Sequence, residues 1–410
     1  MKKLKTIFSP RNLVIWLCVL ILIAAIPEIA RPAMNRTEAV VTMLCVDRVK
    51  EDISVSTTIL TPSQGKNATY EVYNGTGATL GEAINNVSRL IGKEMSFAQC
   101  QIVALGDSIC EESIMPTLDF LTRTKRIGKN SVLINFVGDI VDFSETVSKM
   151  NQEKSLKLEE IINFDKRYIL TKDSNIESFY KGYFSQISLG IMPQLKVQSQ
   201  QGDTAIEVQS VDGGSSDSSS QSSGSQSEKK YLINDGTTCV FKKGKKELEI
   251  SPEDVQKANI FMNDSQKGEI VLEGIYDELY NGEKVLCQVL DKNIKLTPKF
   301  EGETPIFKAD VEIVVIVDEV VADHPDKNFL QRNKEFITPA LIAKLKEKLT
   351  TDMLELIDFC KTNKVDLIGV YKQFYHREYK KFKNYLSQIG EKNYLDGIDY
   401  QISIKVSTHY

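Results

Sequence analysis

The pattern of apolar and polar positions separates one short apolar segment from a long body of alternating strands and helices. From Asn12 to Ile26 every residue after the first is apolar, and no other run in the 410 residues is comparable. A stretch of this kind near the N-terminus predicts a membrane-inserted helix. The residues expected to form this anchor are Leu13, Val14, Ile15, Trp16, Leu17, Val19, Leu20, Ile21, Leu22 and Ile23.

The region from 34 to 197 alternates strand and helix patterns, which predicts a mixed α/β domain. We expect a turn at Asn74–Gly77, and Thr79 with Glu82 then forms a capping box at the start of a helix over 79–92. The remaining predicted strands cover 53–59, 70–73, 101–105 and 131–137, and the remaining predicted helices lie near 111–124, 139–149 and 154–163.

We expect residues 198–229 to form a flexible linker. Nine of the thirteen residues from Ser215 to Ser227 are serine, a composition that cannot bury enough apolar surface to offset its ordering entropy. We expect the linker to separate the first domain from a β-rich middle domain at 230–304. The strands predicted there include 238–241, 269–274, 284–290 and 292–298, the last of them ended by Pro298.

The last region, 305–410, predicts an α+β domain. A buried strand at 311–317 precedes Thr338 and Pro339, which form an N-cap and a first helical position. The long helix that follows should end with Asn363 in the left-handed conformation. Two further helices are expected from about 366 and over 377–389. The alternating segment 398–407 closes the chain as a strand, and its expected partner is 311–317.

Charge at the N-terminus indicates how the anchor is oriented. Lys2, Lys3, Lys5 and Arg11 precede the apolar run, so residues 1–33 form a cytoplasmic head and an anchor with the body outside. A retained single-pass anchor, a cleaved signal and a buried helix of a soluble protein all remain open from the residues alone.

Composition narrows the classes of function. The net charge of −5 argues against nucleic acid, which binds a basic surface. The seven cysteines form no CxxC pair and lie in apolar runs, which predicts buried free thiols. With three histidines far apart in sequence, no metal or cofactor site is expected and no catalytic group is assigned.

Two local patterns have a functional and a structural interpretation. Gly75, Gly77 and Gly81 are spaced almost as in a dinucleotide loop, but the third glycine is one residue late, so we expect a turn and a helix cap. The aromatic and basic segment 371–385 predicts either an amphipathic helix pair with its rings in the core or a docking surface. The residues proposed to contact a partner are Tyr371, Phe374, Tyr375, Tyr379, Phe382 and Tyr385.

Four segments occur in a recognisable order: Ser96–Asp107, Leu118–Arg123, Gly236–Lys242 and Val365–Gly369. Over residues 38 to 410, this ordered set resembles the Ger(x)C family, the C subunits of spore germinant receptors. Ser96–Asp107 is similar to the family's stretch that ends in an apolar strand, and Leu118–Arg123 to its LD-aromatic helix. Gly236–Lys242 resembles the opening of its middle domain, and Val365–Gly369 the start of a helix in its last domain. The chain departs from the family's lipoprotein pattern because no lipid-attachment box precedes a cysteine.

The resemblance implies three mixed sheet-and-helix domains tethered outside the membrane, with a transmembrane helix in place of the lipid. It also implies a non-enzymatic subunit of the spore inner membrane or cell membrane. That subunit would contact membrane-embedded A-type and B-type subunits in nutrient-triggered germination. No small-molecule ligand is assigned to it. An exported cell-envelope enzyme, such as a peptidoglycan hydrolase, and an anchored solute-binding protein are the alternatives.

Overall fold

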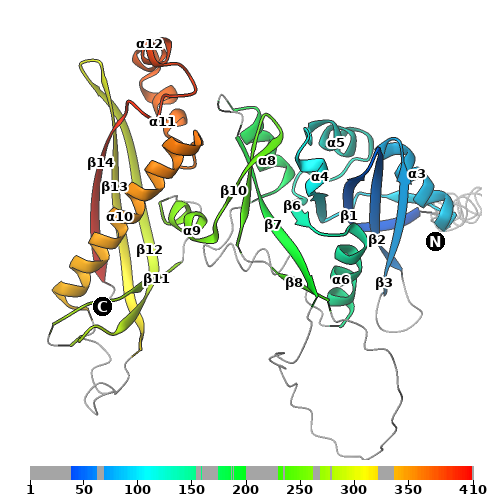
Figure 1. Ribbon diagram of the computed structural model, residues 1–410, viewed down its shortest axis with the longest axis horizontal. Coiled ribbons are helices and arrows are strands. Elements are labelled where there is room, and N and C mark those ends of the chain that lie inside the picture. The colour runs from blue at the N-terminus through cyan, green and yellow to red at the C-terminus, as the bar shows by residue number, and fades with distance from the viewer. Residues whose placement is uncertain are drawn as a thin grey trace, which may run out of the picture.

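The structure is a computed structural model that describes residues 38–61, 69–153, 174–185, 189–199, 230–233, 236–261, 268–277, 279–321 and 337–408, with Leu158 and Ile187. It contains two sheets that lie toward opposite ends of an elongated molecule (Figure 1). The fold is therefore mixed α+β, as the sequence predicts.

The first sheet has ten strands, most of them in the order β10-β9-β7-β6-β5-β1-β2-β3, and its centre is parallel. β4 pairs with β1, and β8 pairs with β7. The strands are β1 (Glu38–Val49), β2 (Asp52–Thr61), β3 (Thr69–Gly77), β4 (Glu94–Ser96), β5 (Ile102–Gly106), β6 (Val132–Val137), β7 (Leu189–Ser199), β8 (Lys230–Ile233), β9 (Thr238–Lys242) and β10 (Lys245–Ile250).

Helices cover both faces of this sheet. One face packs against α3 (Leu80–Ile91), α4 (Asp107–Cys110), α5 (Met115–Asp119) with the π-helical turn η1 (Phe120–Thr124), and α8 (Ile176–Tyr183). The other face packs against α6 (Ile140–Glu153), whose Phe143 stacks on Phe136 of β6. The predicted single helix near 111–124 is wrong in detail, because Pro116 starts a new helix after α4 ends. The helix predicted at 154–163 lies outside the described residues except for Leu158.

The second sheet has the order β11-β12-β13-β14, with β14 parallel to β13. Its strands are β11 (Gly268–Leu272), β12 (Lys284–Glu301), β13 (Thr304–Val321) and β14 (Asp399–Thr408). Val311 pairs with Ile404, so the predicted partnership of the last strand is confirmed. The predicted end at Pro298 is wrong. β12 continues to Glu301, and beyond Val289 its described neighbour is β13 alone, so the residue without an N–H is tolerated there.

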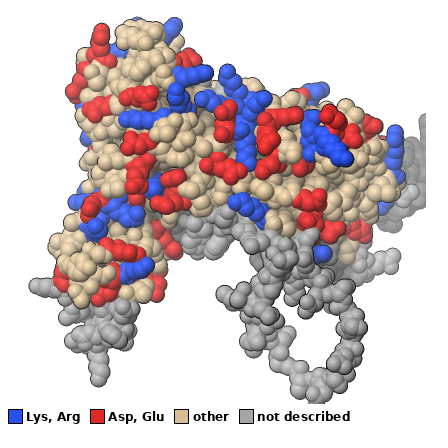
Figure 2. All heavy atoms as spheres, in the orientation of Figure 1, with Lys and Arg blue, Asp and Glu red and all other residues tan. Residues whose placement is uncertain are grey.

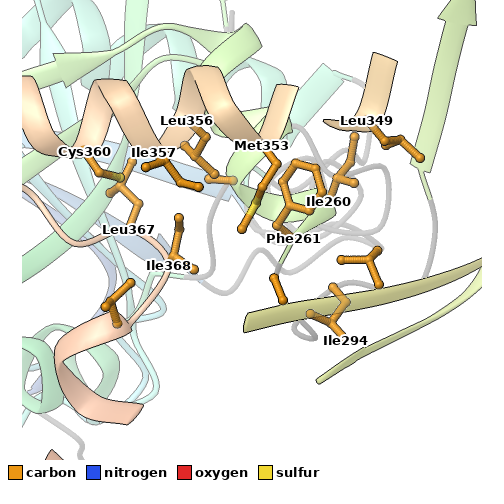
Figure 3. Close-up of a cluster of buried hydrophobic side chains, with 14 of the residues drawn as sticks. Ile260, Phe261, Ile294, Leu349, Met353, Leu356, Ile357, Cys360, Leu367 and Ile368 are labelled. Atoms are coloured by element: carbon orange, nitrogen blue, oxygen red, sulfur yellow. The ribbon is translucent and has the colours of Figure 1, made fainter. Parts of the chain in front are cut away.

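One face of the second sheet is covered by α9 (Pro252–Ile260), α10 (Pro339–Asn363), α11 (Val370–Arg377) and α12 (Tyr379–Ile389). Thr338 caps α10 by accepting a hydrogen bond from the amide of Leu341 at 3.1 Å. Figure 3 shows how the buried stripe of α10, including Leu349, Met353 and Ile357, meets Phe261 and Ile294. The left-handed C-cap is Lys364, with φ of 53°, and not Asn363 as predicted.

Strand pairing divides the predicted middle region between the two sheets. β8 and β9 pair with β7 in the first sheet, whereas β11 and β12 belong with β13 in the second. Ser199 and Lys230, on either side of the serine-rich segment, are register partners in one hairpin. A hairpin signal in the sequence is local and does not show which sheet the hairpin joins. The domain boundaries themselves stay a prediction.

Two expectations concern the membrane and the thiols. Within the part of the chain that the structure describes, no helix combines the length and the apolar character needed to cross a bilayer. The predicted anchor lies outside those residues. The six cysteines in the described ranges are free and buried, as the sequence predicts.

Candidate functional site

The aromatic segment of α11 and α12 forms a surface groove whose position is fixed by a buried carboxylate. Asp366 accepts hydrogen bonds from the amides of Gly369, Val370 and Tyr371, at 2.7, 2.9 and 2.8 Å. Gly369 adopts φ of 83°, which a glycine tolerates without strain. Because these amides begin α11 and lack helical partners, the side chain of Asp366 sets where the helix starts.

The two helices meet at Glu378, which leaves the helical conformation with φ of −130° and ψ of 36°. Phe374 of α11 and Phe382 of α12 are fully buried and stack with their ring centroids 5.1 Å apart. Tyr385 is buried, and its hydroxyl donates to the carbonyl of Tyr394 at 2.7 Å. Burial raises the pKa of Tyr385 to about 12. The inner sides of both helices are therefore core.

The outer sides of the same helices line a groove of about 320 Å³. Of the six residues predicted to contact a partner, Phe374 and Tyr385 lie in the core outside the groove lining, and Tyr371 and Phe382 are buried at its floor. Tyr375 is half-buried, and Tyr379 keeps 46% of its surface exposed. The lining consists of Tyr371, Tyr375, Tyr379, Phe382, Lys383, Leu386, Ser387 and Glu391.

Four lining residues, Lys383, Leu386, Ser387 and Glu391, were missed by sequence reasoning. A spacing of four residues continues from Tyr371 through Tyr379 to Lys383, Ser387 and Glu391. Residues four apart lie on one side of a helix. Within α12 this spacing predicts Lys383 and Ser387 beside Tyr379. It does not predict Leu386, which is off the repeat, or Glu391, which lies beyond the end of α12 at Ile389.

The rings of the groove touch one another. Tyr371 stacks on Tyr375 with centroids 5.9 Å apart, and Tyr375 meets Tyr379 edge-on at 5.0 Å. None of these three hydroxyls hydrogen-bonds another described residue. Burial, followed by the nearby Glu391 carboxylate, raises the pKa of Tyr371, so its hydroxyl stays protonated at neutral pH. The groove therefore offers hydroxyl groups that can donate to a bound molecule.

The surface around the groove is basic. Residues 370–392 contain two acids, Glu378 and Glu391. Their six basic residues, all exposed, are Lys372, Arg377, Lys380, Lys381, Lys383 and Lys392. Figure 2 shows acidic and basic side chains interspersed over most of the face that it draws.

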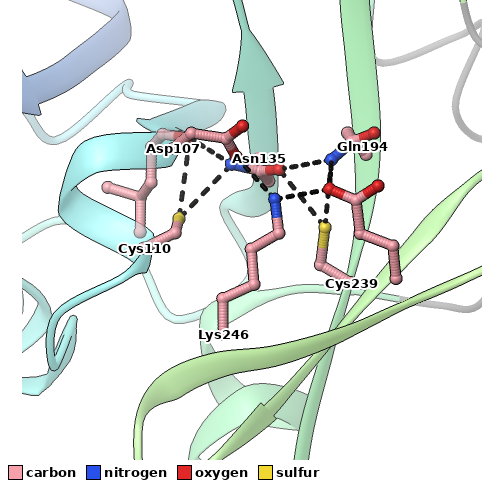
Figure 4. A network of polar contacts seen from close by, with 8 residues as sticks. Asp107, Cys110, Asn135, Gln194, Cys239 and Lys246 are labelled. Carbon is pink, nitrogen blue, oxygen red and sulfur yellow. Dashed lines mark hydrogen bonds and ion pairs between the residues drawn. The ribbon is translucent and has the colours of Figure 1, made fainter.

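A second polar cluster lies inside the first sheet, where Asn135 of β6 meets Gln194 of β7 (Figure 4). Gln194 donates to Asn135 at 3.0 Å and to Glu249 at 2.8 Å. Lys246 of β10 lies 2.7 Å from both Asp107 and Glu249. Burial would lower the pKa of Lys246, but its hydrogen bonds to the two carboxylates outweigh burial and raise it.

The two thiols in this cluster are unreactive by their environment. Cys110 and Cys239 contact the side-chain amide of Asn135 from opposite ends, at 3.4 and 3.2 Å. Burial raises the pKa of Cys239 to about 12 and that of Cys110 well above its ordinary value. A thiol in this state holds its proton and is a poor nucleophile. The cluster joins the β9–β10 hairpin to the parallel strands, and we assign it a structural role.

The remaining sequence candidates also have structural roles. Gly75 and Gly77 belong to β3 and not to a turn, and a Cβ on Gly75 would meet Val87 of α3 at 2.6 Å. These glycines let the helix approach the strand. Glu112 pairs with Arg48 at 3.0 Å. No group of three or more His, Cys, Asp or Glu suited to a metal occurs among the described residues.

Comparison with known families decides the relationship of the chain. The family of spore germination protein N-terminal domains matches residues 36–197, and the family described as spore germination B3/GerAC like, C-terminal, matches residues 236–409. The chain belongs to the GerAC family of spore germination proteins. A search of curated proteins finds no match. Among solved structures, that of the GerBC protein is similar, with 14% identity, a TM-score of 0.47, and coverage of 90% of this chain and 97% of that chain.

The polar cluster around Asn135 and the α11–α12 groove both lie within the residues that the two families match. Asn135 and Gln194 lie in the N-terminal match, and the groove lies in the C-terminal match. The family assignment and the resemblance inferred from the sequence therefore agree on a role in spore germination.

Proposed function

We propose that this GerAC-family chain is the extracytoplasmic subunit of a germinant-receptor-like complex and acts through protein contacts without catalysis. The observation that carries the proposal is the match of two germination families, in order, over residues 36–197 and 236–409. The partners proposed are membrane-embedded A-type and B-type subunits. The apolar run of residues 12–26 would hold the body at the outer surface of the membrane.

The geometry supports contact with a partner at the α11–α12 groove. The groove combines a buried aromatic floor with Tyr379, which is partly exposed, and with hydroxyls that have no described partner. Aromatic side chains in a recess surrounded by polar residues are typical of the positions that dominate binding energy in protein interfaces.

The test combines genetics with purification. Spores that lack this chain should respond poorly to nutrients, and the tagged full-length chain should co-purify with A-type and B-type subunits from detergent-solubilised spore membranes. Normal germination of the deletion strain, together with a full-length chain that purifies without either subunit, would overturn the proposal.

A further inference from the structure

The shape of the α11–α12 groove fits one large side chain from another molecule. Its volume of about 320 Å³ lies at the lower end of the range for ligand pockets, roughly 300–1,000 Å³. Tyr371 and Phe382 form a buried floor, and Leu386 is half-buried beside them. A single anchor residue of a partner would fill this recess, as hot-spot side chains do in protein interfaces.

Charge identifies the kind of segment that carries the anchor. None of the six exposed basic residues between 370 and 392 forms an ion pair with a described residue. Lys383 lines the groove itself, and Lys380 lies one turn away on α12. Unpaired positive charge beside three hydroxyl donors is complementary to carboxylates.

The recess argues against two other ligands. A small cation would need a gap between the rings, but Tyr375 touches both Tyr371 and Tyr379, and the surrounding charge is positive. A lipid surface requires apolar side chains that protrude, whereas Tyr371 and Phe382 are recessed and Glu391 stands at the lining.

We propose that the groove binds an acidic segment of a partner protein, which inserts one large apolar side chain between α11 and α12. This inference rests on the proposed function, because it names the chemistry of the partner at the same site. The floor receives the anchor, the tyrosine hydroxyls donate to main-chain or carboxylate oxygens, and Lys380 and Lys383 attract the flanking acids.

The experiment places a benzophenone amino acid at Ser387 of the full-length chain, co-produced with the A-type and B-type subunits. After irradiation, the adduct is sequenced by mass spectrometry. The test variants are Lys380→Glu with Lys383→Glu, and Tyr379→Ala. Their matched controls are Lys93→Glu with Lys346→Glu, and Tyr276→Ala, which change exposed residues of the same type outside the groove. Tyr379→Phe keeps the ring and removes only the hydroxyl.

An adduct on an acidic segment that contains a large apolar residue is the expected result. The charge reversal should lower its yield about tenfold at low salt and less at high salt, because rim charges act mainly on association. Tyr379→Ala should lower the yield about tenfold or more, Tyr379→Phe less, and the controls not at all. Unchanged melting temperatures would show that the variants fold.

Three results would overturn the inference: an adduct on lipid, an adduct on a basic or uncharged segment, or full adduct yield from the charge-reversed variant. If the chain still co-purifies with the membrane subunits, any of these results leaves the proposed function standing. Loss of co-purification in the unmodified chain would instead count against the proposed function itself.

Discussion

At the scale of single residues, Asp366 connects the core to the groove. Its carboxylate is buried, and both oxygens are used: one receives the amides of Gly369 and Val370, and the other receives the amide of Tyr371. Because Tyr371 belongs both to this cap and to the groove floor, a change at Asp366 reaches the groove without touching its surface.

Replacing Asp366 by alanine should therefore destabilise the chain by about 1–3 kcal/mol, since buried amides lose their acceptor. Asp366→Asn keeps one oxygen and should cost less. Urea denaturation measures the free energy of unfolding, and faster hydrogen exchange at Val370 and Tyr371 would locate the effect. Asp358→Ala, at an exposed acid of α10, is the control and should stay within about 0.5 kcal/mol. Equal losses for Asp366→Ala and Asp358→Ala would contradict this assignment.

The buried thiols make stability depend on pH in the alkaline range. Burial raises the pKa of Cys45, Cys100 and Cys239 from 9.0 to about 12. Between these values the unfolded chain releases protons that the folded chain retains. The contribution of each buried, protonated thiol to the free energy of unfolding is therefore complete below about pH 9. As the pH rises toward 12, this contribution is lost by about 1.4 kcal/mol per pH unit for each thiol.

The measurement is the urea midpoint between pH 7 and 10.5, and we expect a plateau followed by a decline above about pH 9. Cys45→Ala removes one titrating thiol and should make the decline shallower. A midpoint that stays constant up to pH 10.5 would show that these thiols are not held in their protonated form.

At the scale of elements, the close contact between α3 and β3 explains the glycines of the N-terminal region. A Cβ on Gly75 would lie 2.7 Å from the carbonyl oxygen of Ala83, whereas one on Gly81 would meet the ring of Phe120 at an ordinary 3.4 Å. The same residue type is thus required at one position and replaceable at the other.

We expect Gly75→Ala to destabilise the chain by about 1–3 kcal/mol through overpacking. Gly81→Ala, inside α3, should be neutral or stabilising by up to about 1 kcal/mol, because alanine favours the helix. Thermal unfolding of both variants measures the difference. If these glycines instead served a nucleotide loop, Gly75→Ala would leave the melting temperature unchanged.

Elements whose signals are local were predictable from the sequence. Thr79 and Thr338 cap their helices as predicted, because a cap depends on residues three positions apart. The end of α10 was misplaced by one residue, since Lys364 adopts a conformation that the sequence favours for Asn363. In the groove, the burial of Phe374 and Tyr385 depends on distant residues such as Phe300 of β12 and Tyr394, which helix periodicity cannot reveal.

At the scale of the whole molecule, one buried cluster contains residues from both sheets, although no strand of one sheet pairs with a described strand of the other. Leu189 of β7 and Val240 of β9 belong to the same buried cluster as Phe261 and the apolar stripe of α10. Lys257 of α9 also lies 2.8 Å from Glu355 of α10. The sequence could not show this continuity, because it depends on contacts between segments about 100 residues apart.

The serine-rich segment gives the last prediction. Ser199 and Lys230 are register partners, so the segment connects two paired strands, β7 and β8. Deleting residues 204–225 shortens the connection between β7 and β8 from thirty residues to eight. Loop closure then costs about 1 kcal/mol less, because its entropy varies as the logarithm of loop length.

The shortened chain should therefore unfold at a slightly higher urea concentration and co-purify with membrane subunits as the full chain does. Deleting Gly236–Lys242 instead removes β9 from the sheet and is the destabilising comparison. If 198–229 were a spacer between separate domains, shortening it would restrict their relative positions and weaken co-purification without raising stability. Those two measurements together distinguish a hairpin insertion from a spacer, since each interpretation predicts a different combination.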